Sequence, residues 1–483
     1  MAQGILAAGA YIPRLRLQRA SIAQAHGWFN AALKGLGKGE RAMAAWDEDP
    51  VTMAVEAARD CLGAQDRAGV EALRLASTSF PFIDRLNAGI VGDALGLDEG
   101  IRASDQAGSQ RGGTSALMEA LLGSGTTLVV AAEKRPSLGA SPYEMTSGDG
   151  AAALLVGEGE VIAKLIGHAT RTADFVDHYR TMENPTDYQW EERWIRDAGY
   201  AKLVPPVIKA ALAKAGVEAG AVSRFIMPST LGKVGATMAK MAGLPEASVA
   251  DTLMEICGDT GVAHPLLMLA QALESAKAGE KILVVGFGQG ADALLFEVTP
   301  ANEKAKRGLG VAGHLARRKE ETNYSRFLTI NDTVEMERGM RAEADKQTAI
   351  SALWRNRDAV TAFKGGCCKT CGTKQFPKTR ICVNPNCNAV DTQESEPFAE
   401  KTGTIQSYTA DRLTYSPDPP SCYGMIRFED GGRWMMDFTD ADEKALEVGM
   451  PMKMMFRVKD FDTQRGFRRY FWKAAPAASN KGA

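Results

Sequence analysis

The sequence lacks several features that would point to common classes of function. Its 483 residues carry 57 lysines and arginines against 59 aspartates and glutamates, a formal net charge of -2. The two signs are interspersed, so we expect no binding surface for nucleic acid or for an anionic membrane. No apolar run reaches the ~18 residues of a membrane span, and the opening residues lack a basic leader followed by an apolar run. We expect a cytoplasmic protein that acts on small molecules.

Cysteine is also scarce, and four of the eight cysteines fall within one short segment. Cys368, Cys371, Cys382 and Cys387 form two knuckles joined by a basic, proline-containing hairpin. Four thiolates at such spacing suit the tetrahedral geometry of Zn²⁺ and leave no open position for water, so we predict a structural zinc site. Two disulfides or unpaired thiols are the alternative. Cys367 is adjacent to the first knuckle and can in principle replace Cys368, but the spacing before Cys371 favours Cys368.

Residues 1–300 alternate apolar strand-like runs with amphipathic helices, which predicts an α/β layered domain. Two similar series occur, each with an apolar strand, a helix, and a Gly-rich turn before a final strand, which indicates an internal duplication. The expected strands are residues 74–78, 127–132, 151–156, 224–227, 281–286 and 293–298.

The remaining chain differs in composition and in the pattern of its apolar residues. We expect a charged helical linker at 301–365, a zinc ribbon at 366–395, a small OB-fold barrel at 396–476 and a tail at 477–483. The barrel is predicted from five short alternating strands separated by turns such as D-G-G and P-D-P-P. An OB-fold can bind oligonucleotides, but the chain as a whole is not basic.

The segment G-K-G-E-R-A-M-A-A-W-D-E-D-P-V-T-M-A-V-E-A-A, at Gly37 to Ala58, resembles an early signature of hydroxymethylglutaryl-CoA synthases. The resemblance continues through S-P-Y-E-M-T-S-G-D-G and I-L-V-V-G-F-G-Q-G-A-D and so covers nearly all of residues 1–300. It implies the thiolase superfamily fold, a duplicated α/β unit layered α-β-α-β-α, with coenzyme A as co-substrate and a homodimer or higher homo-oligomer.

The C-terminal part, with F-P-K-T-R-I-C and L-T-Y-S-P-D-P-P, is similar to the zinc-ribbon and OB-fold proteins that accompany thiolase-like enzymes. Those partners are separate subunits, whereas here the two parts share one chain. The fusion is consistent with a self-sufficient chain, and the sequence leaves open whether a separate thiolase partner is needed.

The pattern of the synthases breaks at the positions that the resemblance assigns to catalysis. Their Cys nucleophile falls at Gln110, or at Ser109 if the loop shifts by one residue. Their Glu acid/base falls at Phe80, their His at Met227 or Pro228, and their Asn at Asp259. The resemblance thus implies the fold of the synthases without condensation through an acyl-cysteine.

Other groups can replace that chemistry. Gln110, at the start of a helix, can present its amide and nearby N–H groups to an enolate oxygen. Asp259 and His264 supply a carboxylate and an imidazole for acid/base work; the alternatives are a helix cap for Asp259 and a packing role for His264.

Further candidates are less specific. Tyr143 with Glu144 forms a second acid/base pair, and Cys257 is either a relocated nucleophile or a buried packing residue. Lys233 matches a lysine of the synthases and either contacts a coenzyme A phosphate or is a solvated surface residue. Phe80 and Met227 in place of polar groups predict an apolar substrate pocket, suited to an aromatic or bulky acyl group.

These observations predict a coenzyme A-dependent enzyme that cleaves or forms a C–C bond of a β-keto acid or β-keto acyl thioester. Retro-Claisen cleavage with acyl transfer is the first hypothesis. A retro-aldol lyase acting on a β-hydroxy acyl-CoA, a non-catalytic partner of a thiolase and an acyl-CoA-binding carrier are the alternatives.

Overall fold

The computed structural model describes residues 3–63, 65, 67–343, 347 and 349–477, so most of the expected tail lies outside the described residues. The chain forms two compact units. The first comprises Met1–Ala45, Asp49–Gly92 and Leu97–Asn331. The second comprises Trp46–Glu48, Asp93–Gly96 and Asp332–Ala483, and each unit is described by itself.

The first unit is built on nine strands in the order β11-β12-β13-β8-β1-β7-β6-β4-β5. The N-terminal half contains β1 (Gly4–Tyr11), β4 (Ala72–Ala76), β5 (Arg102–Gln106), β6 (Thr127–Glu133) and β7 (Gly150–Gly157). The C-terminal half contains β8 (Ala163–Thr172), β11 (Arg224–Ile226), β12 (Lys281–Phe287) and β13 (Gly290–Val298). All six strands expected from the sequence are present. Their ends differ from the expected ones by at most two residues, except that β13 starts three residues earlier than expected.

The pairing of the strands reveals the duplication. In the N-terminal half β5, β4 and β6 are parallel, and β7 and β1 then follow in antiparallel pairs. In the C-terminal half β11 and β12 are parallel, and β13 and β8 follow in antiparallel pairs. A single parallel bridge from Phe225 to Val249 takes the place of β5. The predicted repeat of one α/β unit is therefore confirmed.

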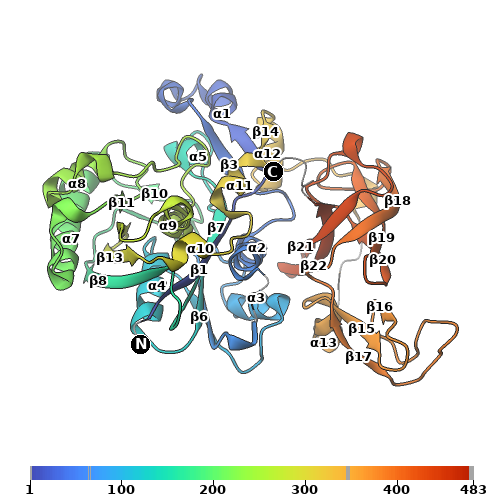
Figure 1. Cartoon of the computed structure of the whole chain (residues 1–483). Helices are drawn as coiled ribbons and strands as arrows, with labels where there is room; N and C mark the ends of the chain where they lie inside the picture. The colour runs from blue at the N-terminus through green and yellow to red at the C-terminus, as the bar shows by residue number, and fades with distance from the viewer. Residues whose placement is uncertain (1–2, 64, 66, 344–346, 348, 478–483) are drawn as a thin grey trace. The chain divides into compact units, whose positions relative to one another are not determined.

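Helices separate and cover the two half-sheets (Figure 1). Helices α4 (Gly112–Leu122) and α9 (His264–Ser275) contact strands of both halves and so lie between them. Helix α2 (Pro50–Leu62) covers β1 and β7 on one outer face, and α7 (Ala201–Ala215) covers β8 and β13 on the other. This is the α-β-α-β-α arrangement that the sequence analysis expected.

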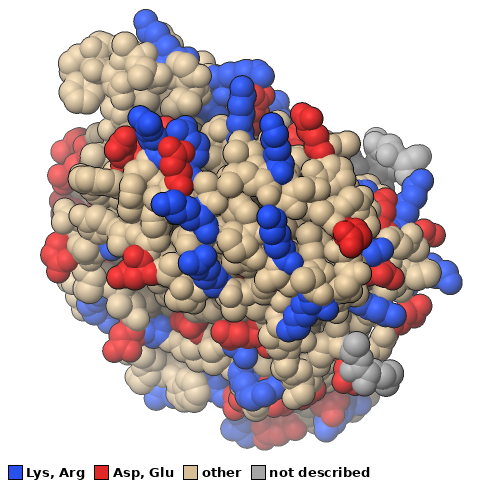
Figure 2. Space-filling view, turned by 90° about the vertical axis from the view of Figure 1, so that its left-hand side faces the viewer, with Lys and Arg blue, Asp and Glu red and all other residues tan. Residues whose placement is uncertain are grey.

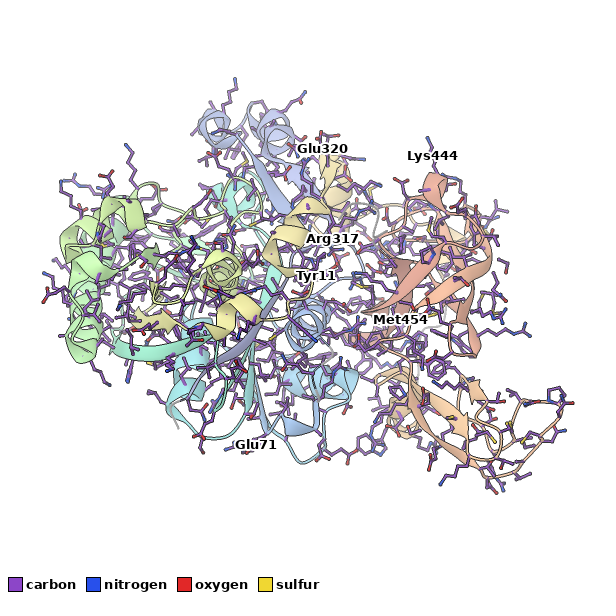
Figure 3. The ribbon with its side chains drawn as sticks, viewed as in Figure 1. Tyr11, Glu71, Arg317, Glu320, Lys444 and Met454 are labelled. Carbon is purple, nitrogen blue, oxygen red and sulfur yellow. The ribbon has the colours of Figure 1, made fainter. Side chains whose placement is uncertain are left out.

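Residues 301–331, assigned above to a linker, lie in the first unit. Helix α11 (Gly310–Ala316) packs on β1 and α9, and β14 (Lys319–Glu321) pairs in parallel with β2 (Leu15–Gln18). The guanidinium of Arg317 lies 4.9 Å from the centre of the Tyr11 ring (Figure 3). The charged residues of this segment therefore include side chains that contact the surface of the first unit.

Smaller elements complete the first unit. The remaining strands are β3 (Glu40–Met43), β9 (His178–Tyr179) and β10 (Tyr188–Gln189). The remaining α-helices are α1 (Arg19–His26), α3 (Asn87–Leu95), α5 (Pro142–Thr146), α6 (Glu192–Trp194), α8 (Val234–Ala242), α10 (Ala301–Lys304) and α12 (Tyr324–Ile330).

The second unit contains two sheets. The first is the ribbon, β15 (Lys364–Cys368) between β16 (Lys374–Gln375) and β17 (Gln393–Pro397). The second has the order β20-β19-β18-β21-β22 and forms the expected barrel. Its strands are β18 (Gly403–Asp411), β19 (Ser421–Phe428), β20 (Arg433–Asp437), β21 (Pro451–Asp462) and β22 (Phe467–Pro476), preceded by α13 (Ile350–Arg355) and α14 (Arg357–Val360).

An aromatic cluster centred on Phe363 joins the ribbon and the barrel. The fully buried Phe363 ring stacks on Trp472 with ring centres 5.8 Å apart and lies 4.6 Å from Phe376 of the ribbon. Phe398 and Phe428 pack against the same ring at 6.2 and 6.0 Å. Such rings bury large apolar areas, so the ribbon and the barrel share one core.

The surface agrees with the balanced composition. On the face shown in Figure 2, lysine and arginine side chains occur among aspartates and glutamates. No helix among the described residues is long and apolar enough to cross a membrane.

The close packing of α4 on the C-terminal half-sheet gives a test of the layered core. A Cβ added at Gly286 of β12 would lie 2.2 Å from Thr114 Oγ1 and 3.0 Å from Thr114 Cβ of α4, so Gly286→Ala must displace Thr114 or the helix that carries it. We expect a loss of about 1–3 kcal/mol in the free energy of unfolding, measured by urea denaturation. Gly220→Ala is the matched control, because nothing lies within 4 Å of its Cβ. Equal stability of the two variants would contradict this packing.

Candidate functional site

The candidate site is organised around the carboxylate of Glu133, the last residue of β6, which is fully buried. Its Oε2 accepts hydrogen bonds from the Thr78 hydroxyl at 2.9 Å and from the Val262 N–H at 3.5 Å. Its Oε1 accepts one from the Ser79 hydroxyl. Because a buried carboxylate must be hydrogen-bonded, Glu133 fixes the loop after β4 and the turn before α9 against β6.

Gln110, at the position expected for the nucleophile, belongs to the same network. Its side-chain Nε2 donates to Thr78 Oγ1 at 3.2 Å, and the side chain is half-buried just before α4. Gly261 has a φ of +55°, and a Cβ there would lie 2.7 Å from Glu133 Cγ and 3.0 Å from Gln110 Oε1. The site therefore brings Gln110, Glu133 and the Gly261 turn together.

The other face of the Gln110 loop packs on the turn between β12 and β13. The Ser109 hydroxyl donates to the Gly288 carbonyl at 2.8 Å, and Arg111 Nε donates to the same oxygen at 3.0 Å. Arg111 also forms an ion pair with the buried Asp292, at 2.8 Å. The hydroxyl proton of Ser109 is thus used in a hydrogen bond, and Ser109 holds the loop in place.

The structure brings Asp259 and His264 together, with Oδ1 and Nδ1 3.8 Å apart, but in different surroundings. The Asp259 side chain is 26% exposed, and its Oδ1 accepts from the Gly261 N–H at 3.0 Å. The His264 ring is fully buried; its Nδ1 accepts from the Thr260 N–H at 2.9 Å, so the proton lies on Nε2, which donates to Thr252 O at 2.7 Å. Both ring nitrogens are engaged, as in the packing alternative, and we keep only Asp259 as an acid/base candidate.

Tyr143 and Glu144 face different surroundings and do not form a pair. Glu144 is buried with its Oε1 bonded to the Tyr324 hydroxyl and its Oε2 to the Ala140 N–H at 2.8 Å. His26 lies 3.6 Å from the same carboxylate. Burial raises the pKa of Tyr143, which is partly accessible. Of the two, only Tyr143 remains a candidate.

The two cysteines of the first unit are not accessible nucleophiles. Cys61 is 4% exposed and Cys257 is fully buried. Burial raises the pKa of the Cys257 thiol to about 12 and also raises that of Cys61. Since the thiolate is the nucleophilic form, Cys257 is the packing residue of the two alternatives.

The predicted pocket residues do not all line one cavity. Met227 is 3% exposed and packs in the core formed by α7, α8 and the C-terminal half-sheet. Its apolar character therefore serves packing. Phe80 is half-buried, directly after the Ser79 that bonds Glu133. Lys233 is exposed at the start of α8 and is free to meet a phosphate.

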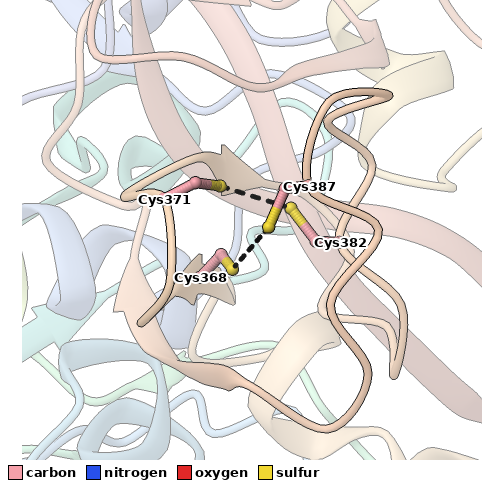
Figure 4. Close-up of side chains that lie close together, drawn as sticks. All are labelled: Cys368, Cys371, Cys382 and Cys387. Atoms are coloured by element: carbon pink, nitrogen blue, oxygen red, sulfur yellow. Dashed lines mark hydrogen bonds between the residues drawn. The ribbon is translucent and has the colours of Figure 1, made fainter.

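In the second unit the four predicted cysteines converge (Figure 4). Their sulfur atoms all lie within 4.8 Å of one another, with Cys371 and Cys382 at 3.6 Å and Cys368 and Cys387 at 3.9 Å. A tetrahedral Zn²⁺ with Zn–S bonds of about 2.3 Å requires sulfur separations of about 3.8 Å. The Thr392 hydroxyl beside Cys368 lowers the pKa of its thiol to about 6. The donor set therefore fits Zn²⁺.

Comparison with known proteins gives the family. Residues 212–297 match the model of the 3-oxoacyl-[acyl-carrier-protein] synthase III C terminal, and residues 396–457 match the ChsH2 C-terminal OB-fold domain. A hydroxymethylglutaryl-CoA synthase of Aeropyrum pernix is 30% identical over 338 residues, covering 68% of this chain and 93% of that protein. The chain belongs to the hydroxymethylglutaryl-CoA synthase family. It is therefore related to the thiolase-type acyl-CoA condensing enzymes.

Solved structures agree on the fold of this family member. A hydroxymethylglutaryl-CoA synthase complexed with CoA has a TM-score of 0.62 at 20% identity, covering 72% of this chain and 95% of that one. The 3-oxoacyl-(acyl carrier protein) synthase III of Pseudomonas aeruginosa has a TM-score of 0.55 at 21% identity, covering 62% and 99%. At these sequence identities, the similarity establishes the fold and nothing further.

Sequence reasoning missed two residues of the network. It placed the family's acid/base position at Phe80, whereas the side chain that contacts Gln110 is Thr78, two residues earlier. It also ended the expected strand at residue 132 and gave Glu133 no role. A charged residue closing a strand that is buried along its whole length is a signal that could have found it, since such a charge requires partners.

Thiol labelling can test the absence of a cysteine nucleophile. At pH 8 a thiol with a pKa of about 12 is about one part in 10⁴ thiolate. We expect iodoacetamide to leave Cys61 and Cys257 of the native protein unlabelled, as read by peptide mass spectrometry, and to label both after denaturation. Rapid native labelling of Cys257 would restore the nucleophile hypothesis.

Substitution can test the metal ligands. We expect Cys382→Ser to lower the bound zinc from about one per chain to a small fraction, because three thiolates hold Zn²⁺ poorly, and to make the ribbon sensitive to protease. The matched control is Cys367→Ser, because Cys367 lies outside the cluster of four sulfur atoms. Undiminished zinc in Cys382→Ser would refute the assignment.

Proposed function

We propose that this chain uses coenzyme A to cleave or form a C–C bond of a β-keto acid or β-keto acyl thioester without an acyl-cysteine. The observation that carries the proposal is the position of Gln110 two residues before α4, hydrogen-bonded to Thr78. The relatives are synthases of a β-hydroxy thioester, and a synthase structure of this fold holds CoA. Coenzyme A as co-substrate is therefore part of the proposal.

The reaction in the cleavage direction is a retro-Claisen step. The thiol sulfur of coenzyme A adds to the β-carbonyl carbon, and the bond between that carbon and the α-carbon breaks. Its electron pair forms the enolate of the leaving group, and the thiol proton finally reaches the α-carbon. Water in place of the thiol would give a free acid by the same steps.

Gln110 is suited to stabilise the enolate. A primary amide carries two N–H donors, and only one of those of Gln110 is engaged by Thr78. A fixed donor aimed at developing negative charge is a strong catalytic device because it needs no reorganisation during the reaction. Thr78 and Glu133 act through Gln110 as positioning residues.

The remaining candidates complete the proposal. Asp259 and Tyr143 are the partly accessible acid/base groups, and Lys233 is a contact for a coenzyme A phosphate. Phe80 contributes apolar surface for a bulky acyl group. A structural Zn²⁺ in the ribbon, a homo-oligomeric state and a cytoplasmic location stay predictions.

A retro-aldol reaction on a β-hydroxy acyl-CoA is the second candidate. The inaccessibility of both cysteines in the first unit favours it, because aldol cleavage transfers no acyl group and needs no acyl carrier.

The test combines a substrate panel with one substitution. Purified protein is incubated with aliphatic and aromatic β-keto acids, β-keto thioesters and β-hydroxy acyl-CoAs, with and without coenzyme A, and products are read by mass spectrometry. We expect new acyl-CoA only when coenzyme A is present, and a loss of about 10²-fold in kcat for Gln110→Ala. Gln24→Ala is the control, since Gln24 is exposed on α1.

Other outcomes separate the alternatives. An aldehyde or ketone product would establish the aldolase. No product across the panel would overturn the enzymatic proposal and favour a non-catalytic partner of a thiolase. Full activity of Gln110→Ala would remove the enolate role of this residue.

A further inference from the structure

A short hairpin next to the site carries a histidine that no part of the function above uses. Strands β9 (His178–Tyr179) and β10 (Tyr188–Gln189) pair with each other. The hairpin is anchored by a buried ion pair, in which Arg135 Nε donates to Asp187 Oδ2 at 3.0 Å. Arg135 lies two residues after Glu133, so this anchor holds the hairpin against the end of β6.

The hairpin also reaches the polar network directly. The guanidinium of Arg180 donates to Thr78 Oγ1 at 2.8 Å, the hydroxyl that binds both Gln110 and Glu133. Along an extended chain, residues two apart point to the same side. His178 therefore shares the inward side with Arg180, whereas Tyr179 between them is 51% exposed.

The imidazole of His178 is held in one orientation. Its Nδ1 lies 2.8 Å from Asp177 Oδ2, and the other oxygen of Asp177 accepts from Gln289 Nε2 at 3.2 Å. Gln289 belongs to the turn between β12 and β13 whose Gly288 binds Ser109. Since an ionised carboxylate only accepts, Nδ1 carries the proton and Nε2 presents its lone pair.

The groups that surround this imidazole belong to the same site. The Tyr143 ring of α5 lies with its centre 6.5 Å from that of His178. Burial raises the pKa of Tyr200, and the negative charges of Asp177 and Asp259 raise it further. Both carboxylates therefore lie near the same phenol. Other charged groups near the imidazole are Arg180, Arg135, Asp187 and Glu133, and the loop of the hairpin adds the exposed Glu183.

We propose that His178 is the general base of the reaction, oriented by Asp177, and that it replaces the histidine and glutamate that the family's pattern lacks here. The proposal deepens, and rests on, the proposed C–C bond chemistry. Nε2 takes the proton of the attacking coenzyme A thiol, and the imidazolium returns that proton to the α-carbon of the enolate. One proton moves, and no oxidant or reductant is needed.

The test compares His178→Gln and Asp177→Asn with His168→Gln. His168 is the matched control because it lies on β8 beside Lys214, with its Nε2 2.6 Å from Nζ. We expect His178→Gln to lower kcat by about 10²-fold or more and to abolish the acidic limb of the pH–rate profile. Asp177→Asn should lower kcat by roughly tenfold or more and shift the acidic limb of the pH–rate profile. His168→Gln should leave kcat and the pH–rate profile unchanged.

A second measurement separates this proposal from the function on which it rests. The reverse of the proposed protonation is removal of an α-proton from the acyl-CoA that leaves as the enolate. Exchange of that proton for deuterium in D₂O needs a base but no bond cleavage, is slow without an enzyme, and is read by mass spectrometry. If the natural protein catalyses this exchange and His178→Gln does not, the role of His178 as the base is supported even when no cleavage occurs. Equal exchange in both proteins, no exchange in either, or an unchanged pH–rate profile in His178→Gln would overturn it.

Discussion

The first unit depends on one buried carboxylate. Glu133 closes β6 with no exposure to solvent, and its donors come from the loop after β4 and from the turn before α9. A charge in such a place is stable only while its partners stay in position. The same hydrogen bonds that compensate for the burial of Glu133 therefore fix the loops that carry Thr78, Ser79 and Val262, and through Thr78 they fix Gln110.

The duplication supplies the rigid frame for these loops. Helices α4 and α9 lie between the two half-sheets, and each begins at the site, α4 two residues after Gln110 and α9 five residues after Asp259. Side chains on such elements are held more closely than side chains on long loops. The chemistry of the site can therefore change by substitution of single residues while the layers stay as they are.

Much of this arrangement could be predicted from the sequence, because buried strands and a cysteine cluster leave local patterns. The six expected strands and the zinc ligands needed only composition and spacing. Thr78 could not be placed in this way, since its contact with Gln110 spans 32 positions of the chain. The pair Asp177 and His178 is adjacent in the sequence, but the contacts that bring the pair to the site, Arg180 with Thr78 and Gln289 with Asp177, span 102 and 112 positions. The sequence leaves His264 open between an acid/base role and a packing role, because its buried partners, Thr252 and Thr260, cannot be read from the sequence.

The two halves of the repeat have diverged at equivalent points. Strands β6 and β12 both have seven residues, and they end at Glu133 and Phe287 respectively. Where the first half places a carboxylate with its donors, the second places a ring stacked on Tyr200, with ring centres 4.0 Å apart. A nearly symmetric scaffold thus ends its two equivalent strands in different chemistry, a hydrogen-bonded carboxylate in one half and an aromatic stack in the other, so the repeat of the fold does not repeat the site.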